Sequence, residues 1–221
     1  MKRALIISPH SDDAILCCGH ILLGDDYAAT VLTVECNPRR LAEDRKLCEF
    51  IERPHATPTL PDFIDDLYPE YFRTKGRTAV LTREDVRAFY ETRLSIPLDT
   101  LRRELRSTVA DYGHDGYTVF GPMGVGHPFH LLINEMIADL CDYYYREFPH
   151  SYKRRAQTQF ADETQSLKRA WVCADPDVHE VKMALAQKFY RSQSGFFFYE
   201  QGSIKKQYPE EIYELPNLRH K

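Results

Sequence analysis

The chain opens with ALIIS at residues 4–8, DAILCCGHILL at residues 13–23, ATVLTV at residues 29–34 and LAEDRKLCEFI at residues 41–51. The first and third segments are short apolar runs, which are typical of parallel strands buried on both faces. The second and fourth segments place apolar residues on one face at helical spacing. Strand, helix, strand and helix in this order form a βαβ unit, which predicts a mostly parallel sheet flanked by helices.

The later segments continue this alternation. We expect helices at residues 82–90, 97–111, 131–148 and 178–190, and strands at residues 117–120 and 170–174. Four prolines interrupt residues 54–76, so we expect a surface loop there, close to the mouth of a substrate site. The tail after residue 195 favours no particular structure. Because no repeat or linker divides the chain, we expect a single α/β domain with a Rossmann-like sheet over residues 1–221.

The composition is that of a globular protein. The 221 residues are 43% apolar and 28% charged, and 29 Lys and Arg against 33 Asp and Glu give a net charge of −4. This mild acidity argues against a nucleic-acid partner, and no apolar run reaches the roughly 18 residues of a membrane helix. The first apolar run is too short for a secretory signal, and the six cysteines form no Cys-x-x-Cys pair. We therefore expect buried thiols and a cytoplasmic protein.

Polar side chains gather where the first predicted strand ends. His10, Asp12 and Asp13 stand there, and sites in open α/β sheets form at the carboxyl ends of strands. Adjacent carboxylates repel one another, and a bound cation removes that cost. His10 and Asp13 could face one metal ion while Asp12 faces a water. Alternatively, Ser11 or Asp12 caps the following helix, which would explain one carboxylate and leave the histidine unexplained.

Two histidines follow a later strand in the same way. They lie in GHPFH at residues 126–130, where His127 and His130 are three residues apart at the start of a predicted helix and fall on one side of it. His10, Asp13 and His130 together would supply two imidazoles and one carboxylate. Three such ligands suit zinc with room for a water, and they also suit ferrous iron.

Three motifs of the sequence occur together in a known family. They are HSDDA at residues 10–14, HPFH at residues 127–130, and KMAL at residues 182–185 followed by YRSQ at residues 190–193. In this order they resemble the His-Pro-Asp-Asp-Glu, His-x-Asp-His and Lys-x-x-Ala-Leu … Tyr-x-Ser-Gln motifs of the LmbE/PIG-L zinc-dependent N-deacetylases. With the strand before the first motif, the resemblance spans residues 4–193.

The resemblance implies a role for each matching residue. His10, Asp13 and His130 would hold Zn²⁺, with Fe²⁺ as the alternative ion. Asp12 would act as the general base, and His127 would stabilise the oxyanion or protonate the leaving amine. The substrate would be a small N-acyl molecule with a linear amide, such as an N-acetylated amino sugar. No nucleic acid or membrane would be involved, and assembly as a homo-oligomer stays open.

The sequence departs from the family pattern at three positions. Ala14 replaces the usual Glu, and Ser11 replaces the usual Pro. Phe129 stands where the family has Asp, so the group expected to orient His127 is missing.

Two other functions remain open on the same residues. One is a non-hydrolytic iron enzyme that uses the same three ligands and a second substrate. The other is a metal-free sugar- or nucleotide-binding module, in which the carboxylates serve only as helix caps. Metal analysis separates the second alternative from a hydrolase, and amide hydrolysis without oxygen tests the first.

Overall fold

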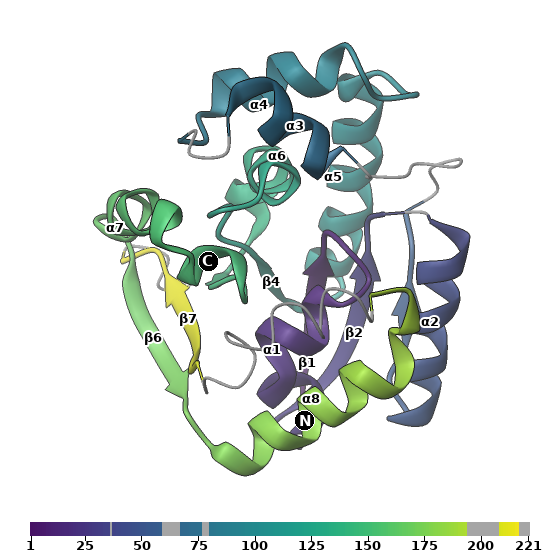
Figure 1. The fold of residues 1–221 in the computed structure, drawn as a ribbon. Coiled ribbons are helices and arrows are strands. Elements are labelled where there is room, and N and C mark those ends of the chain that lie inside the picture. The colour runs from purple at the N-terminus through teal and green to yellow at the C-terminus, as the bar shows by residue number, and fades with distance from the viewer. Residues whose placement is uncertain (36, 59–66, 77–79, 194–207, 217–221) are drawn as a thin grey trace.

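The computed structural model describes residues 1–35, 37–58, 67–76, 80–193 and 208–216. These residues form a seven-stranded sheet in the order β3-β2-β1-β4-β5-β7-β6 (Figure 1). The strands are β1 Lys2–Ser8, β2 Tyr27–Thr33, β3 His55–Ala56, β4 Thr118–Pro122, β5 Tyr143–Tyr145, β6 Lys168–Cys173 and β7 Glu210–Glu214. Strands β1 to β5 pair in parallel, whereas β7 is antiparallel to both β5 and β6. The expected fold class, a mostly parallel α/β sheet flanked by helices, is confirmed.

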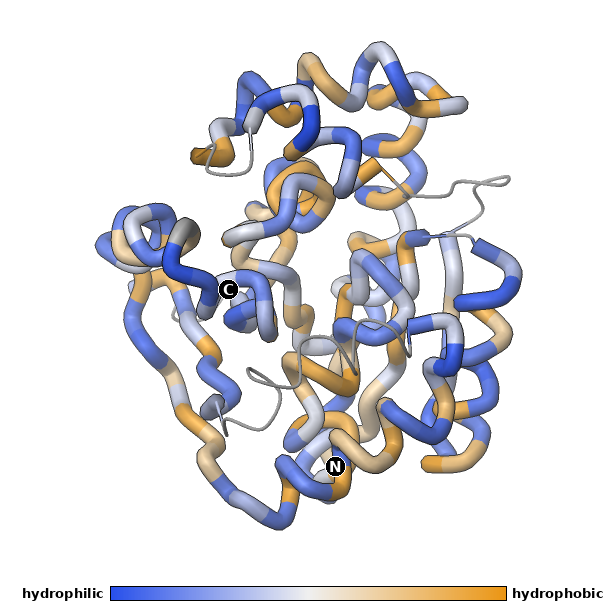
Figure 2. The backbone as a smooth tube through the Cα atoms, in the orientation of Figure 1, coloured by the Kyte–Doolittle hydropathy of each residue, from blue (hydrophilic) through white to orange (hydrophobic). Residues whose placement is uncertain are grey.

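Helices cover both faces of the sheet. They are α1 Asp13–Leu23, α2 Pro38–Phe50, α3 Tyr68–Lys75, α4 Arg83–Glu91, α5 Leu98–His114, α6 Pro128–Ile137, α7 Gln157–Thr164 and α8 Pro176–Phe189. Successive side chains of a strand point to opposite faces, so Ala4 and Ile6 of β1 pack with α1, α2 and α8. Leu5 and Ile7 pack on the other face with α3 to α6. In Figure 2 the hydrophobic segments accordingly run along α6 and the central strands, whereas α7 is largely hydrophilic.

The prediction of one continuous helix over residues 131–148 is wrong. Helix α6 ends at Ile137, a 3-10 turn spans Ala138–Leu140, and the three tyrosines form strand β5. Tyr145 lies in the sheet core, where its hydroxyl donates a 2.7 Å hydrogen bond to the carbonyl of Ile7. Aromatic residues favour strands, and this short apolar run becomes a strand because it pairs with β4 and β7, which are remote in sequence.

Two other expectations have partial outcomes. The proline-rich residues 54–76 contain β3 and α3 in their described parts, and residues 59–66 lie outside the described residues. Most of the tail after residue 195 also lies outside them, apart from β7 and its neighbours.

The described cysteines match the expectation for thiols. Cys17, Cys18, Cys48 and Cys141 are buried free thiols and Cys173 is a partly exposed one, whereas Cys36 lies outside the described residues. Across the described ranges, no helix combines the length and the apolar character needed to cross a membrane.

Candidate metal centre

The two sequence motifs meet at one edge of the sheet. In the sheet, β2 and β3 lie on one side of β1, and β4 lies on its other side. Strands β1 and β4 are parallel neighbours, so the loops that follow them share the carboxyl edge at the point where the strand order reverses. Ligands bind at such switch points in open α/β sheets. The first loop carries His10, Asp12 and Asp13, and the second leads to His127 and His130.

Three atoms that could ligate a metal ion, two imidazole nitrogens and one carboxylate oxygen, form a small triangle at this edge. His10 Nδ1 lies 3.0 Å from His130 Nε2, and Asp13 Oδ2 lies 3.4 Å from the first nitrogen and 3.2 Å from the second. All three side chains are buried. A tetrahedral ion with nitrogen and oxygen ligands at 2.0–2.1 Å would set its ligands about 3.3–3.4 Å apart. The triangle therefore has the dimensions of three corners of such a site.

The charge of Asp13 is stabilised by its neighbours. Burial raises the pKa of Asp13, but the imidazoles of His130 and His10 outweigh burial and hold the pKa well below its ordinary value. The backbone N–H of His10 also donates a 2.7 Å hydrogen bond to Asp13 Oδ2. Asp13 is thus an ionised carboxylate whose oxygen points toward both imidazoles.

Asp12 stands at the N-cap position of α1 without capping it. Its side chain makes no capping hydrogen bond, and Ser11 Oγ is buried without a hydrogen-bond partner among the described residues. The N–H of Ala14 instead donates a 3.0 Å hydrogen bond to Ser8 Oγ. Burial and the neighbouring Asp13 raise the pKa of Asp12 to about 7, against the opposing effect of Arg40. The capping alternative therefore does not account for Asp12.

His127 caps helix α6 with one of its ring nitrogens. Nδ1 accepts a 3.2 Å hydrogen bond from the N–H of Phe129. The ring of Tyr68 stacks on His127 at a centroid distance of 4.5 Å, and His150 meets it edge-on at 4.7 Å. Burial and the nearby imidazoles, that of His130 first, lower the pKa of His127 well below its usual value, so the ring is neutral at pH 7.

The third protein ligand could in principle be His127 or Asp13. Ligand atoms of His10, His127 and His130 all lie within 4.8 Å of one another, so these three could also hold an ion. Because the Nδ1 lone pair of His127 accepts the helix N–H, its neutral ring carries the proton on Nε2 and has no free lone pair for a metal. The hydrogen bonding therefore favours Asp13 as the third ligand.

Phe129 fills space that a carboxylate could not. Its side chain is fully buried, packing against Tyr90 at a centroid distance of 5.9 Å and against His10 at 5.2 Å. The Phe129 side chain therefore belongs to the core on which α6 packs, and the hydrogen-bond partner of His127 Nδ1 is the backbone N–H of Phe129, a donor where a carboxylate would be an acceptor.

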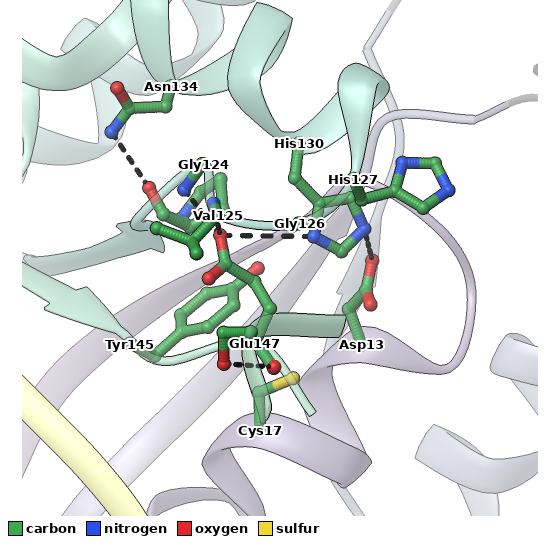
Figure 3. Close-up of polar contacts among 12 residues, drawn as sticks. Asp13, Cys17, Gly124, Val125, Gly126, His127, His130, Asn134, Tyr145 and Glu147 are labelled. Carbon is green, nitrogen blue, oxygen red and sulfur yellow. Dashed lines mark hydrogen bonds and ion pairs between the residues drawn. The ribbon is translucent and has the colours of Figure 1, made fainter. Parts of the chain in front are cut away.

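The sequence did not single out Glu147, Tyr68 or His150. Glu147 follows β5 and is fully buried, and its Oε1 lies 3.9 Å from His130 Nδ1 (Figure 3). Burial raises the pKa of Glu147 to about 8. No sequence pattern pointed to Glu147, because it lies within residues 131–148, which were expected to form a helix. His150 follows that segment and belongs to no recognised pattern. Tyr68 belongs to the proline-rich residues 54–76, which were expected near a substrate mouth.

The comparisons with known proteins support the fold. No family model matches the chain, and no curated protein matches it. A solved structure, described as the crystal structure of a deacetylase-bog complex in the biosynthesis pathway of teicoplanin, matches with a TM-score of 0.62. The match covers 96% of this chain and 97% of that chain at 18% identity. The chain shares its fold with a deacetylase. At this identity the likeness establishes the architecture and leaves the chemistry to be argued from the site.

Proposed function

We propose that this protein is a metal-dependent hydrolase of small-molecule amides, an N-deacetylase similar to the LmbE/PIG-L family. The observation that carries the proposal is the triangle of His10 Nδ1, Asp13 Oδ2 and His130 Nε2, whose sides are 3.0 to 3.4 Å long. The fold shared with a deacetylase over 96% of the chain supports the same conclusion.

His10, Asp13 and His130 would hold Zn²⁺, and the two-imidazole, one-carboxylate set would also accept Fe²⁺. When bound, the ion supplies a Lewis acid that polarises the amide carbonyl and activates water. Asp12 lies beside this set and takes a proton from the attacking water. A pKa of about 7 suits a general base that works near neutral pH.

The remaining steps use Asp12 and His127. His127 lies against His10 and His130, with ring centroids 4.7 and 4.6 Å away, so it can reach the amide oxygen as negative charge develops there. Asp12 then passes the proton that it took from the water to the leaving nitrogen, while His127, whose neutral ring carries its proton on Nε2, acts as a hydrogen-bond donor. One amide and one water become a carboxylic acid and a free amine, and Asp12 returns to its starting state.

The substrate we propose is an N-acetylated amino sugar or a related small conjugate. The LmbE/PIG-L resemblance supports this class, and the described free thiols fit a cytoplasmic location. A metal-free binding module has weaker support, because neither Ser11 nor Asp12 caps α1. No feature of the site favours a non-hydrolytic iron enzyme, in which Asp12 would have no role.

The test combines metal analysis with substrate screening. The purified protein is analysed for bound metals and then incubated without oxygen with a panel of N-acyl amino sugars. Amine release that stops after chelation and returns with added Zn²⁺ is the expected result. A metal-replete protein that hydrolyses no amide would contradict the hydrolase, and unchanged hydrolysis after verified metal removal would contradict the metal dependence.

A further inference from the structure

Glu147 connects the proposed metal ligand His130 to the loop that precedes it. On one side, Glu147 Oε1 accepts hydrogen bonds from the backbone N–H groups of Gly124 and Val125, the second at 3.2 Å. On the other side, the same oxygen lies 3.9 Å from His130 Nδ1. Figure 3 shows Glu147 and Asp13 on opposite sides of the His130 ring. Glu147 therefore faces the nitrogen of His130 that points away from the triangle.

The hydrogen bonds determine what Glu147 Oε1 can do. An oxygen that already accepts two N–H groups is an acceptor whether or not the carboxyl group is protonated, because a proton would reside on Oε2. A favourable partner at His130 Nδ1 must then carry a hydrogen. A neutral imidazole with its proton on Nδ1 has its lone pair on Nε2, which is the atom 3.2 Å from Asp13 Oδ2.

We propose that Glu147 is a positioning residue for the metal site, which holds His130 in the tautomer whose Nε2 can bind the ion. Histidine ligands generally donate their other N–H to a carboxylate or carbonyl, which fixes the ring and its tautomer. At 3.9 Å the two atoms face one another at more than hydrogen-bond length. The inference rests on the metal site of the proposed function and not on its amide chemistry.

The surroundings hold Glu147 in this place. Its backbone carbonyl accepts hydrogen bonds from the N–H of Ser151 at 3.0 Å and from Ser151 Oγ at 2.6 Å. The next residue, Phe148, donates its N–H to Cys17 Sγ of α1 at 3.4 Å. Glu147 Oε2 is buried with no hydrogen-bond partner among the described residues. A carboxyl group is costly to keep there for the loop alone, since unpartnered buried oxygens destabilise the fold.

The loop also has a second clamp that does not reach His130. Gln159 of α7 donates a 2.9 Å hydrogen bond to the carbonyl of Gly124 and accepts a 3.2 Å hydrogen bond from the N–H of Gly126. Gly126 has φ +78°, and a Cβ there would lie 2.5 Å from the carbonyl oxygen of His150, so the loop needs its glycine. Gln159 thus offers a matched control, because its loss disturbs the same loop without removing the acceptor at His130.

The experiment measures Zn²⁺ affinity by chelator competition in the full-length wild type and in Glu147→Leu, Glu147→Gln and Gln159→Leu. We expect Glu147→Leu to weaken Zn²⁺ binding by about 10–100-fold. Glu147→Gln keeps an acceptor oxygen and should retain most of the affinity, and Gln159→Leu should bind nearly as the wild type does. In the zinc-loaded wild type, NMR should detect a proton on His130 Nδ1, and this signal should weaken in Glu147→Leu.

Each other outcome has a definite meaning. Equal weakening in Gln159→Leu and Glu147→Leu would overturn the proposal in favour of a purely structural loop clamp. A folded Glu147→Leu variant with wild-type affinity would also overturn it. If Glu147→Leu fails to fold, a wild-type His130 that carries its proton on Nε2 is the overturning result. A wild type that binds no Zn²⁺ would contradict the proposed function itself, so the two failures are distinguishable.

Discussion

Buried charged side chains lie at the N-terminal end of α1 and beside its later turns, and the two groups differ in how their charges are balanced. Beside the later turns of α1, at what we call its C-terminal end, Lys182 of α8 donates a 2.8 Å hydrogen bond to Glu210 Oε1 of β7 and a 3.0 Å hydrogen bond to the carbonyl of Leu16. His20 hydrogen-bonds the other oxygen of Glu210, and Trp171 donates to His20. This cluster contains its own cation, so its carboxylate is paired within the protein.

The N-terminal end of α1 has no such cation on its central carboxylate. Among the described residues, Asp13 has imidazole partners, His10 and His130, and no Lys or Arg pairs with it. Asp12 adds a second buried carboxyl group beside it. A buried charge is tolerated when it is paired or coordinates a metal. One end of α1 is thus a structural cluster whose carboxylate is paired within the protein, whereas the carboxylates at the other end could accept a cation, as in the proposed function.

The largest expected effect separates the two ends directly. His130→Ala removes one of the three proposed protein ligands, so the bound divalent ion should fall from about one per chain to almost none, with loss of amide hydrolysis. Elemental analysis of the folded variant measures this. Lys182→Met, at the opposite end of α1, is the control and should keep its metal. Equal metal content in His130→Ala and the wild type would contradict the ligand set.

Asp12→Asn should separate metal binding from catalysis. The substitution keeps the shape of the side chain and removes its basicity, so we expect wild-type metal content and a fall in kcat of about 10²–10⁴-fold. Elemental analysis and steady-state kinetics on the same preparation measure both quantities. If the variant lost its metal instead, Asp12 and Asp13 would have to exchange roles.

Lys182→Met should affect stability rather than chemistry. The change leaves Glu210 buried without its lysine, and breaking one side of a buried ion pair destabilises a protein by about 3–5 kcal/mol. Chemical denaturation of the wild type and the variant gives the free energy of unfolding. A variant as stable as the wild type would remove the structural role that we assign to this end of α1.

Two substitutions of His127 separate the helix cap from the proposed catalytic hydrogen bond. In His127→Asn the side-chain oxygen can replace Nδ1 as the acceptor of the Phe129 N–H, but nothing replaces Nε2–H. Loss of one oxyanion donor should lower kcat by about 10²–10³-fold with little change in stability. His127→Gln should retain more of kcat and lose about 1 kcal/mol of stability with the cap. An inactive but stable His127→Gln would instead favour proton donation by His127.

The smallest effect is a pH dependence at the structural end of α1. Burial raises the pKa of Glu210, but the hydrogen bond from His20 and the charge of Lys182 bring it below its ordinary value of 4.5. The ionised pair therefore stabilises the fold above about pH 4.5, and this contribution is lost as the pH falls through the folded pKa. Thermal melts across this range should show a smaller loss of stability on acidification in Lys182→Met, because without the lysine the pKa of Glu210 in the folded protein rises toward or above its unfolded value. If the melting temperature fell with decreasing pH in the same way in both proteins, this assignment would be contradicted.

Much of the local structure was predictable from the sequence. The predicted helix at Asp13–Leu23 has the same bounds in the structure, because its start and its apolar face are set by neighbouring residues. The short apolar run at residues 4–8 falls within β1, since a strand buried on both faces is apolar throughout. The two histidine motifs were likewise readable, because each lies in one loop between a strand and a helix.

The tertiary structure decided what depends on pairing between remote segments. Residues 143–145 became β5 through β4 and β7, and this strand brings Glu147 to His130. Tyr68 reaches His127 from α3, across more than fifty residues of sequence. The sequence by itself therefore determined the fold class and the residue types of the candidate site. Only the folded chain decided which groups surround them, because short local patterns carry no information about contacts between segments far apart in the chain.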